Sequence, residues 1–172
     1  MTEKKGRGRP KGSPNKPKMK LITERTKLPM NADVYEILCQ CNIVAEDDVP
    51  TAVNGLKIFG DRNAAVKKTL QWLFDKTINS TLPEGITPYK PSEAGKLASD
   101  LAETSLRFEF KYFKYFVTEQ VPLPRREQMW IEMLEGIPYH EAQMIDLVKD
   151  GKNPFPNIDQ SLAVAAFPDI RV

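Results

Sequence analysis

The residues with the clearest chemistry stand near the start of the chain, in the stretch "GRGRPKG", residues 6–12. Gly8 and Pro10 favour an extended and narrow peptide, because glycine carries no side chain and proline fixes its backbone angle. Arg7 and Arg9 place two cations along that peptide. The floor of the minor groove in A·T-rich DNA offers acceptor atoms and a strong negative potential to cations of this kind. The stretch therefore predicts contact with the minor groove of A·T-rich double-stranded DNA.

Lysines surround the arginines, and in this respect the segment resembles an AT-hook followed by a basic extension. Lysine ammonium groups bind phosphates and release counterions, so binding is expected to weaken as salt rises. The alternative is a basic tail that binds any polyanion, RNA included. The predicted DNA-binding residues are Lys4, Lys5, Arg7, Gly8, Arg9, Pro10, Lys11, Lys16, Lys18 and Lys20.

Charge divides the chain into two parts. Residues 1–27 hold ten Lys or Arg and two Glu, a net charge of +8, whereas the rest has a net charge of −6. Residues 1–30 also hold four prolines and three glycines and few large apolar side chains. The apolar surface that they could bury is too small to offset the entropy lost when this segment becomes ordered. We expect a disordered basic arm over 1–30 and an acidic folded domain over 31–172.

The acidic part carries the periodicity of helices and no alternating pattern typical of strands. Asn31 is expected to cap a first helix, and Pro50 to stand in the first turn of a second. Gly60 is expected to end that second helix, and Asp61 to cap a third. Near the end of the chain, Asp159 is expected to cap a short last helix. The prediction is an all-α fold, a small single-domain bundle of about six or seven short helices.

A long helical stretch is expected after the proline-rich segment 82–91, from Ser92 to about Glu119. It contains "LRFEFKYFKYF", residues 106–116, in which basic and aromatic residues alternate. Such a run can be a stacking platform for single-stranded nucleic acid. Helical spacing favours a core helix instead, because two adjacent aromatic stripes make one wide apolar face. The stripes are Leu106, Phe110, Phe113 and Val117, and beside them Phe108, Tyr112 and Tyr115, with Lys111 and Lys114 at the solvated edge.

No constellation of residues nominates an active site, and the sequence predicts a protein that is not an enzyme and needs no cofactor. His140 is the single histidine, and no nucleophile or partner acid is nominated for it. Cys39 and Cys41 are expected to be reduced and structural, and one His with Cys-x-Cys does not supply a metal site. No apolar run approaches the ~18–20 residues that span a bilayer, so no membrane contact is expected.

The helix predicted over Arg125 to Glu135 is apolar around most of its circumference. A tryptophan and two methionines on one helix can form a contact for a protein partner. The alternative is a central core helix. The candidate protein-binding residues are Met129, Trp130 and Met133.

Three stretches recur in this order in a known family: "FDKTINSTLPEGITPYKP", "REQMWIEMLEGIPYHEAQMIDLVKD" and "AFPDI". Residues 33–170 resemble small, largely uncharacterised proteins encoded by T4-like tailed phages. The resemblance implies a phage origin and no settled activity, so it assigns no catalytic residues. The hook-like arm is a departure from the family pattern.

These observations favour a non-enzymatic, DNA-binding phage accessory protein in the host cytoplasm, associated with the nucleoid. The arm would hold A·T-rich DNA while the helical domain binds a protein partner from the transcription or replication machinery. The alternative is a structural or assembly protein, present in the virion, whose arm touches DNA non-specifically. A third hypothesis is a nucleic-acid enzyme whose site the sequence does not reveal, and mutation of Glu127, Glu135, His140 and Glu141 without effect would count against it.

Overall fold

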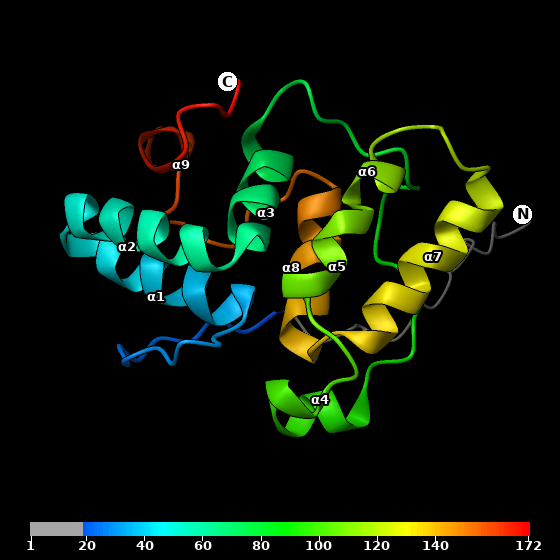
Figure 1. Cartoon of the computed structure of the whole chain (residues 1–172), viewed down its shortest axis with the longest axis horizontal. Coiled ribbons are helices and arrows are strands. Elements are labelled where there is room, and N and C mark those ends of the chain that lie inside the picture. Colours follow the sequence, from blue (N-terminus) through cyan, green and yellow to red (C-terminus); the bar gives the residue numbers. More distant parts are fainter. Residues whose placement is uncertain (1–18) are drawn as a thin grey trace, which may run out of the picture.

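The computed structural model describes residues 19–172, and this part of the chain is all-helical, with no strand (Figure 1). It is therefore the all-α domain that the sequence predicts. Its helices are α1 (Val34–Asp47), α2 (Val49–Arg62), α3 (Ala64–Phe74), α4 (Glu93–Leu97), η1 (Ser99–Leu101), α5 (Leu106–Glu109), η2 (Phe110–Tyr112), α6 (Phe113–Phe116), α7 (Leu123–Gly136), α8 (Tyr139–Lys149) and α9 (Gln160–Ala166), of which η1 and η2 are 3-10 helices.

Short polar side chains start the helices of the N-terminal half. The side chain of Asp33 accepts a hydrogen bond from the backbone N–H of Glu36 at 2.7 Å, so Asp33 caps α1 in place of the predicted Asn31. Asp48 caps α2, with Pro50 in its first turn as expected. Asn63 caps α3, because α2 runs on through Gly60 and the predicted cap at Asp61 to Arg62.

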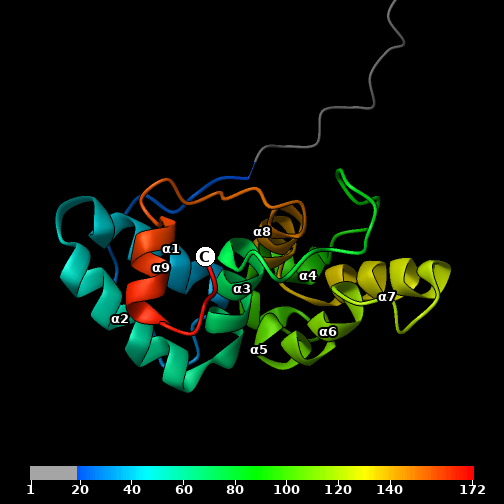
Figure 2. The ribbon, with the colours of Figure 1, turned by 90° about the horizontal axis from the view of Figure 1, so that it is seen from above.

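Gly60 has a packing role rather than a terminating one. A Cβ atom at this position would lie 2.8 Å from Cζ of Phe167, beyond the end of α9. The missing side chain thus lets α2 approach the C-terminal segment closely. Figure 2 shows α9 lying over the pair formed by α1 and α2.

The predicted long helix from Ser92 to Glu119 is broken into pieces. Ser92 caps the short α4, a turn of 3-10 helix follows, and α5, η2 and α6 then form one continuous helical segment over residues 106–116. Short polar residues between 99 and 105 account for the break, because Ser, Thr and Asp favour caps and turns over helix interiors.

Aromatic rings join the two ends of the domain. Trp130 on α7 packs edge-on against Trp72 of α3, with ring centroids 5.7 Å apart, and against Phe116 of α6 at 5.0 Å. Trp72 also meets Phe113 edge-on at 5.0 Å. In Figure 1, α3 and α8 lie between the α1–α2 pair at one end and α7 at the other.

Residues 19–30, which the sequence assigned to the arm, pack against the helical domain. Gln40 of α1 holds this segment at two points: its side-chain oxygen accepts from the N–H of Thr26 at 3.0 Å, and its amide nitrogen donates to the carbonyl of Glu24 at 2.9 Å. The side chains of Met19, Leu21, Ile22 and Leu28 are partly buried against the core. The part of the chain that packs against the helical domain therefore begins before Asn31, within residues 19–30.

Candidate functional site

The predicted DNA-binding residues lie almost wholly outside the residues that the structure describes. Lys4, Lys5, Arg7, Gly8, Arg9, Pro10, Lys11, Lys16 and Lys18 all precede residue 19. Lys20 is described, and it is exposed to solvent. Its backbone carbonyl accepts a hydrogen bond from the Tyr35 hydroxyl, which ties the base of the arm to α1.

The three residues predicted to bind a protein partner are mostly core residues. The side chains of Trp130 and Met133 are 2% and 5% exposed, and only Met129 is half-buried. Most of the surface of Trp130 and Met133 is therefore used in packing within the domain. The apolar circumference of α7 is explained by packing, because one side of the helix meets α6 and another meets the loop 80–91.

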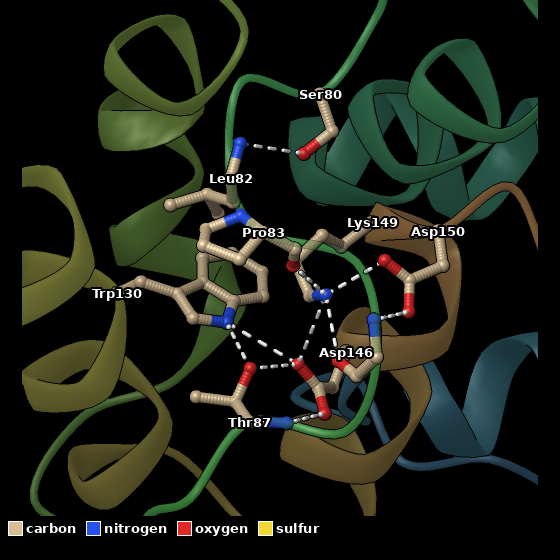
Figure 3. A network of polar contacts seen from close by, with 9 residues as sticks. Ser80, Leu82, Pro83, Thr87, Trp130, Asp146, Lys149 and Asp150 are labelled. Atoms are coloured by element: carbon tan, nitrogen blue, oxygen red, sulfur yellow. Dashed lines mark hydrogen bonds and ion pairs between the residues drawn. The ribbon is translucent and has the colours of Figure 1, made fainter. Parts of the chain in front are cut away.

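That loop is fixed to α8 by charged residues at the end of the helix, shown in Figure 3. The Lys149 ammonium group donates to the carbonyls of Pro83 and Gly85 at 3.0 and 2.9 Å and to Oδ1 of Asp150 at 2.7 Å. Its side chain is 1% exposed. Oδ2 of Asp150 in turn accepts from the N–H of Gly85 at 3.0 Å. The backbone turn at Gly85 has a φ of +103°, a conformation that favours glycine.

Asp146 holds the next part of the loop. One carboxylate oxygen accepts from the N–H of Thr87 at 3.0 Å, and the other accepts from the Thr87 hydroxyl at 2.5 Å. The indole N–H of Trp130 donates to the same hydroxyl at 3.0 Å (Figure 3). We call Trp130, Asp146, Lys149 and Asp150 the loop clamp. The polar groups of the loop clamp form hydrogen bonds with one another and with the loop. We therefore assign the clamp a structural role.

A second group of acids, made of buried Asp33 and Glu141 and half-buried Glu36, lies where α1, α5 and α8 meet. The Glu141 carboxylate accepts from the N–H of Val34 at 3.0 Å and from the N–H of Leu106 at 3.1 Å, so it joins the first residues of α1 and α5. Burial, with the charge of Asp33, raises the pKa of Glu141 to about 8. Burial and Asp33 likewise raise the pKa of Glu36 to about 7.

The four residues of the enzyme hypothesis do not converge on one site. The Glu141 carboxylate accepts the two backbone hydrogen bonds described above. The ring of the neighbouring His140 stacks on the ring of Tyr35, with centroids 4.9 Å apart. Glu135 accepts from the N–H of Lys90 at 3.0 Å, and Glu127 lines a hollow beside the loop. Within residues 19–172 no group of three or more His, Cys, Asp or Glu is arranged to hold a metal ion. No helix there is both long and apolar enough to cross a membrane.

The sequence predicts that both aromatic stripes of the segment 106–116 are buried. In the structure, only the first stripe is. Leu106 and Phe113 are buried, as expected, and Phe110 and Val117 are partly so. Two members of the second stripe face outward instead: Phe108 is 61% exposed and Tyr112 is 46% exposed, while Tyr115 is half-buried. The reason is geometric, because α3 and α7 cover only one side of this segment.

Basic residues lie directly beside the exposed rings. We call the six residues Arg107, Phe108, Lys111, Tyr112, Lys114 and Tyr115 the basic-aromatic face. The Lys114 ammonium group lies 5.0 Å from the centroid of the Tyr115 ring. A hollow of about 300 Å³ lies beside the contact between this segment and α3, lined by Lys68, Lys111 and Lys114 together with Trp72 and Phe113.

Fold and site together define a small all-helical domain with a clamped proline-rich loop. The chain belongs to the family of unknown function DUF6433, whose model matches residues 45–153, well over half of the sequence. No curated protein and no solved structure matches it. The matched range includes the loop clamp and the basic-aromatic face, whereas the basic arm lies before it.

Proposed function

We propose that this protein is a non-enzymatic, DNA-binding accessory protein of a phage, and that its arm occupies the minor groove of A·T-rich DNA. The observation that carries the proposal is the Arg-Gly-Arg-Pro sequence, flanked by glycines and lysines, at residues 7–10. Arg7 and Arg9 contact the groove floor, and the lysines contact phosphates on either side.

The helical domain supplies a different kind of contact. Its net negative charge opposes close approach to DNA over most of its surface, and this favours a protein partner. An apolar groove of about 520 Å³ lies between the proline-rich loop and α8, lined by Ile86, Tyr89, Tyr139 and Leu147. Ile86 is 65% exposed there, so a large apolar side chain is available to a partner at this groove.

The same groove is lined by Met19 and Leu21, so it begins where the arm joins the domain. A partner bound there would be held close to DNA captured by the arm. We place this partner in the transcription or replication machinery and the protein itself in the host cytoplasm, on the nucleoid.

A binding measurement on the full chain tests the arm. Fluorescence anisotropy with A·T-rich and G·C-rich duplexes of equal length should show tighter binding to the A·T-rich duplex. Changing Arg7 and Arg9 to Ala should remove this preference, because it removes the groove contacts. The matched control is Lys16→Ala with Lys18→Ala, which removes the same charge and should weaken both duplexes alike.

Equal affinity of the parent protein for the two duplexes would rule out the minor-groove proposal. It would favour a structural or assembly protein whose arm binds DNA non-specifically. Mass spectrometry of purified virions then decides that alternative, since an assembly protein is present in many copies.

A further inference from the structure

The exposed rings and the lysines of the basic-aromatic face line different hollows. The hollows beside Phe108 and Tyr112 contain several acids: Asp33, Glu36, Asp100 and Glu103 in the first, and Glu103, Glu109 and Glu132 in the second. Lys111 and Lys114 line the hollow of about 300 Å³ beside α3, to which α3 contributes Lys68. We call this third hollow the lysine hollow. Positive charge on this side of the domain is therefore concentrated at one place.

The lining of the lysine hollow contains cations and no acid. Lys68, Lys111 and Lys114 are all exposed to solvent. Within residues 19–172 none of the three forms an ion pair, and Lys114 only lies over the ring of Tyr115. Three lysines without acidic partners make this position positive on a domain that is acidic as a whole.

Two acids of the adjoining segments have partners of their own. Asp169 forms an ion pair with Lys67 at 2.6 Å and accepts a hydrogen bond from the side chain of Gln71, a lining residue, at 3.4 Å. Asp75, at the end of α3, is buried, and its carboxylate accepts from the N–H of Arg171 at 3.1 Å. The three ammonium groups therefore remain available to negative charge on a ligand.

The floor of the lysine hollow is apolar and fixed. Trp72 and Phe113 are buried and pack edge-on, with ring centroids 5.0 Å apart. Ile78, Phe110 and Val117 are partly buried and complete the apolar lining. The volume lies at the small end of the range of ligand pockets, about 300–1,000 Å³. A hollow of this size accommodates one large apolar side chain rather than a longer apolar segment.

We propose that the lysine hollow binds an acidic segment of a partner protein through one large apolar side chain. The apolar side chain lies over Trp72 and Phe113, and the neighbouring Asp or Glu carboxylates pair with the lysines. The hollow shares no lining residue with the apolar groove beside α8, so it is a second protein contact. The proposal does not depend on DNA binding by the arm.

A nucleic-acid strand suits these surroundings less well. A phosphate chain that continued from the lysine hollow along the segment 106–116 would meet the acids beside Phe108 and Tyr112, and like charges repel. The arm of the same chain is excluded as the ligand because it is basic, with a net charge of +8 over residues 1–27. The complementary ligand is therefore short, locally acidic and apolar at one position.

The test uses the full chain and two fluorescein-labelled acidic peptides, which carry either Phe or Ala between the same Asp and Glu residues. The basic arm attracts both peptides alike, because their charge is identical, whereas the hollow distinguishes them. Fluorescence anisotropy should show that the Phe peptide binds on the order of tenfold tighter or more, owing to burial of its ring. Equal affinities for the two peptides would overturn the proposal.

Lys111→Glu with Lys114→Glu locates the binding site. This double variant should lose the preference for the Phe peptide, and its affinity for that peptide should fall on the order of tenfold. The matched control is Lys57→Glu with Lys152→Glu, which changes two exposed lysines outside the hollow by the same charge. The control should keep the preference. If both double variants bind the Phe peptide equally, the site is not the lysine hollow.

Two other occupants predict different results. A second copy of the chain would make the parent self-associate, and light scattering would show that Lys111→Glu with Lys114→Glu separates the copies. A single DNA strand would make oligothymidylate lose more affinity in this variant than in the control. Either result overturns the proposal. Binding to duplexes reports on the arm separately: loss of A·T preference in the parent, with the Phe-peptide preference intact, removes the arm function and keeps this site.

Discussion

Replacement of Lys149 by Met tests how strongly the loop clamp stabilises the domain. Met keeps most of the apolar length of the side chain and removes the ammonium group. The change leaves the carbonyls of Pro83 and Gly85 without their donor and leaves Asp150 without its cation at 2.7 Å. Asp146, whose Oδ1 lies 3.9 Å from the same nitrogen, also loses a compensating charge.

Burial sets the size of the effect. The side chains of Lys149, Asp146 and Asp150 are 1%, 9% and 6% exposed, so solvent screens their interactions weakly. Removing one partner of a buried ion pair typically costs about 3–5 kcal/mol, because the remaining charge stays buried. A domain of this size has a free energy of unfolding of about 5–15 kcal/mol, and the melting temperature should fall by roughly 6–20 °C.

Thermal unfolding followed by circular dichroism at the helix band measures this change. Lys152→Met is the matched control: it makes the same chemical change three residues further on, at an exposed position, and is expected to shift the free energy of unfolding by less than ~0.5 kcal/mol. A melting temperature for Lys149→Met equal to that of Lys152→Met would refute the reasoning.

Two further predictions concern stability. Burial, together with Asp33, raises the pKa of Glu36 to about 7 in the folded protein. The protonated Glu36 carboxyl group therefore stabilises the folded state below about pH 4.5, and this contribution is lost as the pH rises through about 7. The melting temperature should therefore fall between about pH 5 and pH 8, and Glu36→Gln, which carries no charge, should reduce that fall; identical pH profiles for variant and parent would contradict this. In α2, Gly55→Ala should raise the free energy of unfolding by up to ~1 kcal/mol, because nothing lies within 4 Å of the added Cβ. Gly60→Ala should lower it by about 1 kcal/mol, since the Cβ would meet the buried Phe167 ring at 2.8 Å and overpacking outweighs the gain in helix propensity. Denaturant unfolding of the pair measures the difference, and equal shifts would be inconsistent with the packing role of Gly60.

Some helix starts could be predicted from the sequence, because a cap is a local interaction, although Asp33 and Asn63 are the caps where Asn31 and Asp61 were expected. Asp159 accepts from the N–H of Leu162 at 2.8 Å and starts α9 as expected. The aromatic segment shows the opposite case. Periodicity predicts which residues share a side of a helix, but it cannot tell how many sides the rest of the fold covers. Phe108 and Tyr112 therefore looked like core residues and are exposed.

The candidate sites show the same difference between local and long-range features. The DNA-binding arm is predicted from residues that are neighbours in the sequence, so this prediction does not depend on the tertiary structure. The loop clamp joins groups that are far apart in sequence: Thr87 and Asp146 are separated by 59 positions, and Gly85 and Asp150 by 65. The available signal was the spacing of Asp146, Lys149 and Asp150, which puts them at one end of α8, but their partner could not be named without the tertiary structure.

Residues more than a hundred positions further along the chain complete the N-terminal helices. Asn42 of α1 pairs with Asn157 across 115 positions, through its side-chain oxygen at 2.8 Å and its carbonyl at 3.0 Å. The N–H of Val34, the first residue of α1, donates to Glu141, which lies 107 positions later in the sequence. Phe167 packs into the space beside Gly60 of α2. Contacts of such long sequence separation slow folding, because the chain must close large loops before they form. During synthesis, α1 and α2 therefore leave the ribosome about a hundred residues before the segments that complete them.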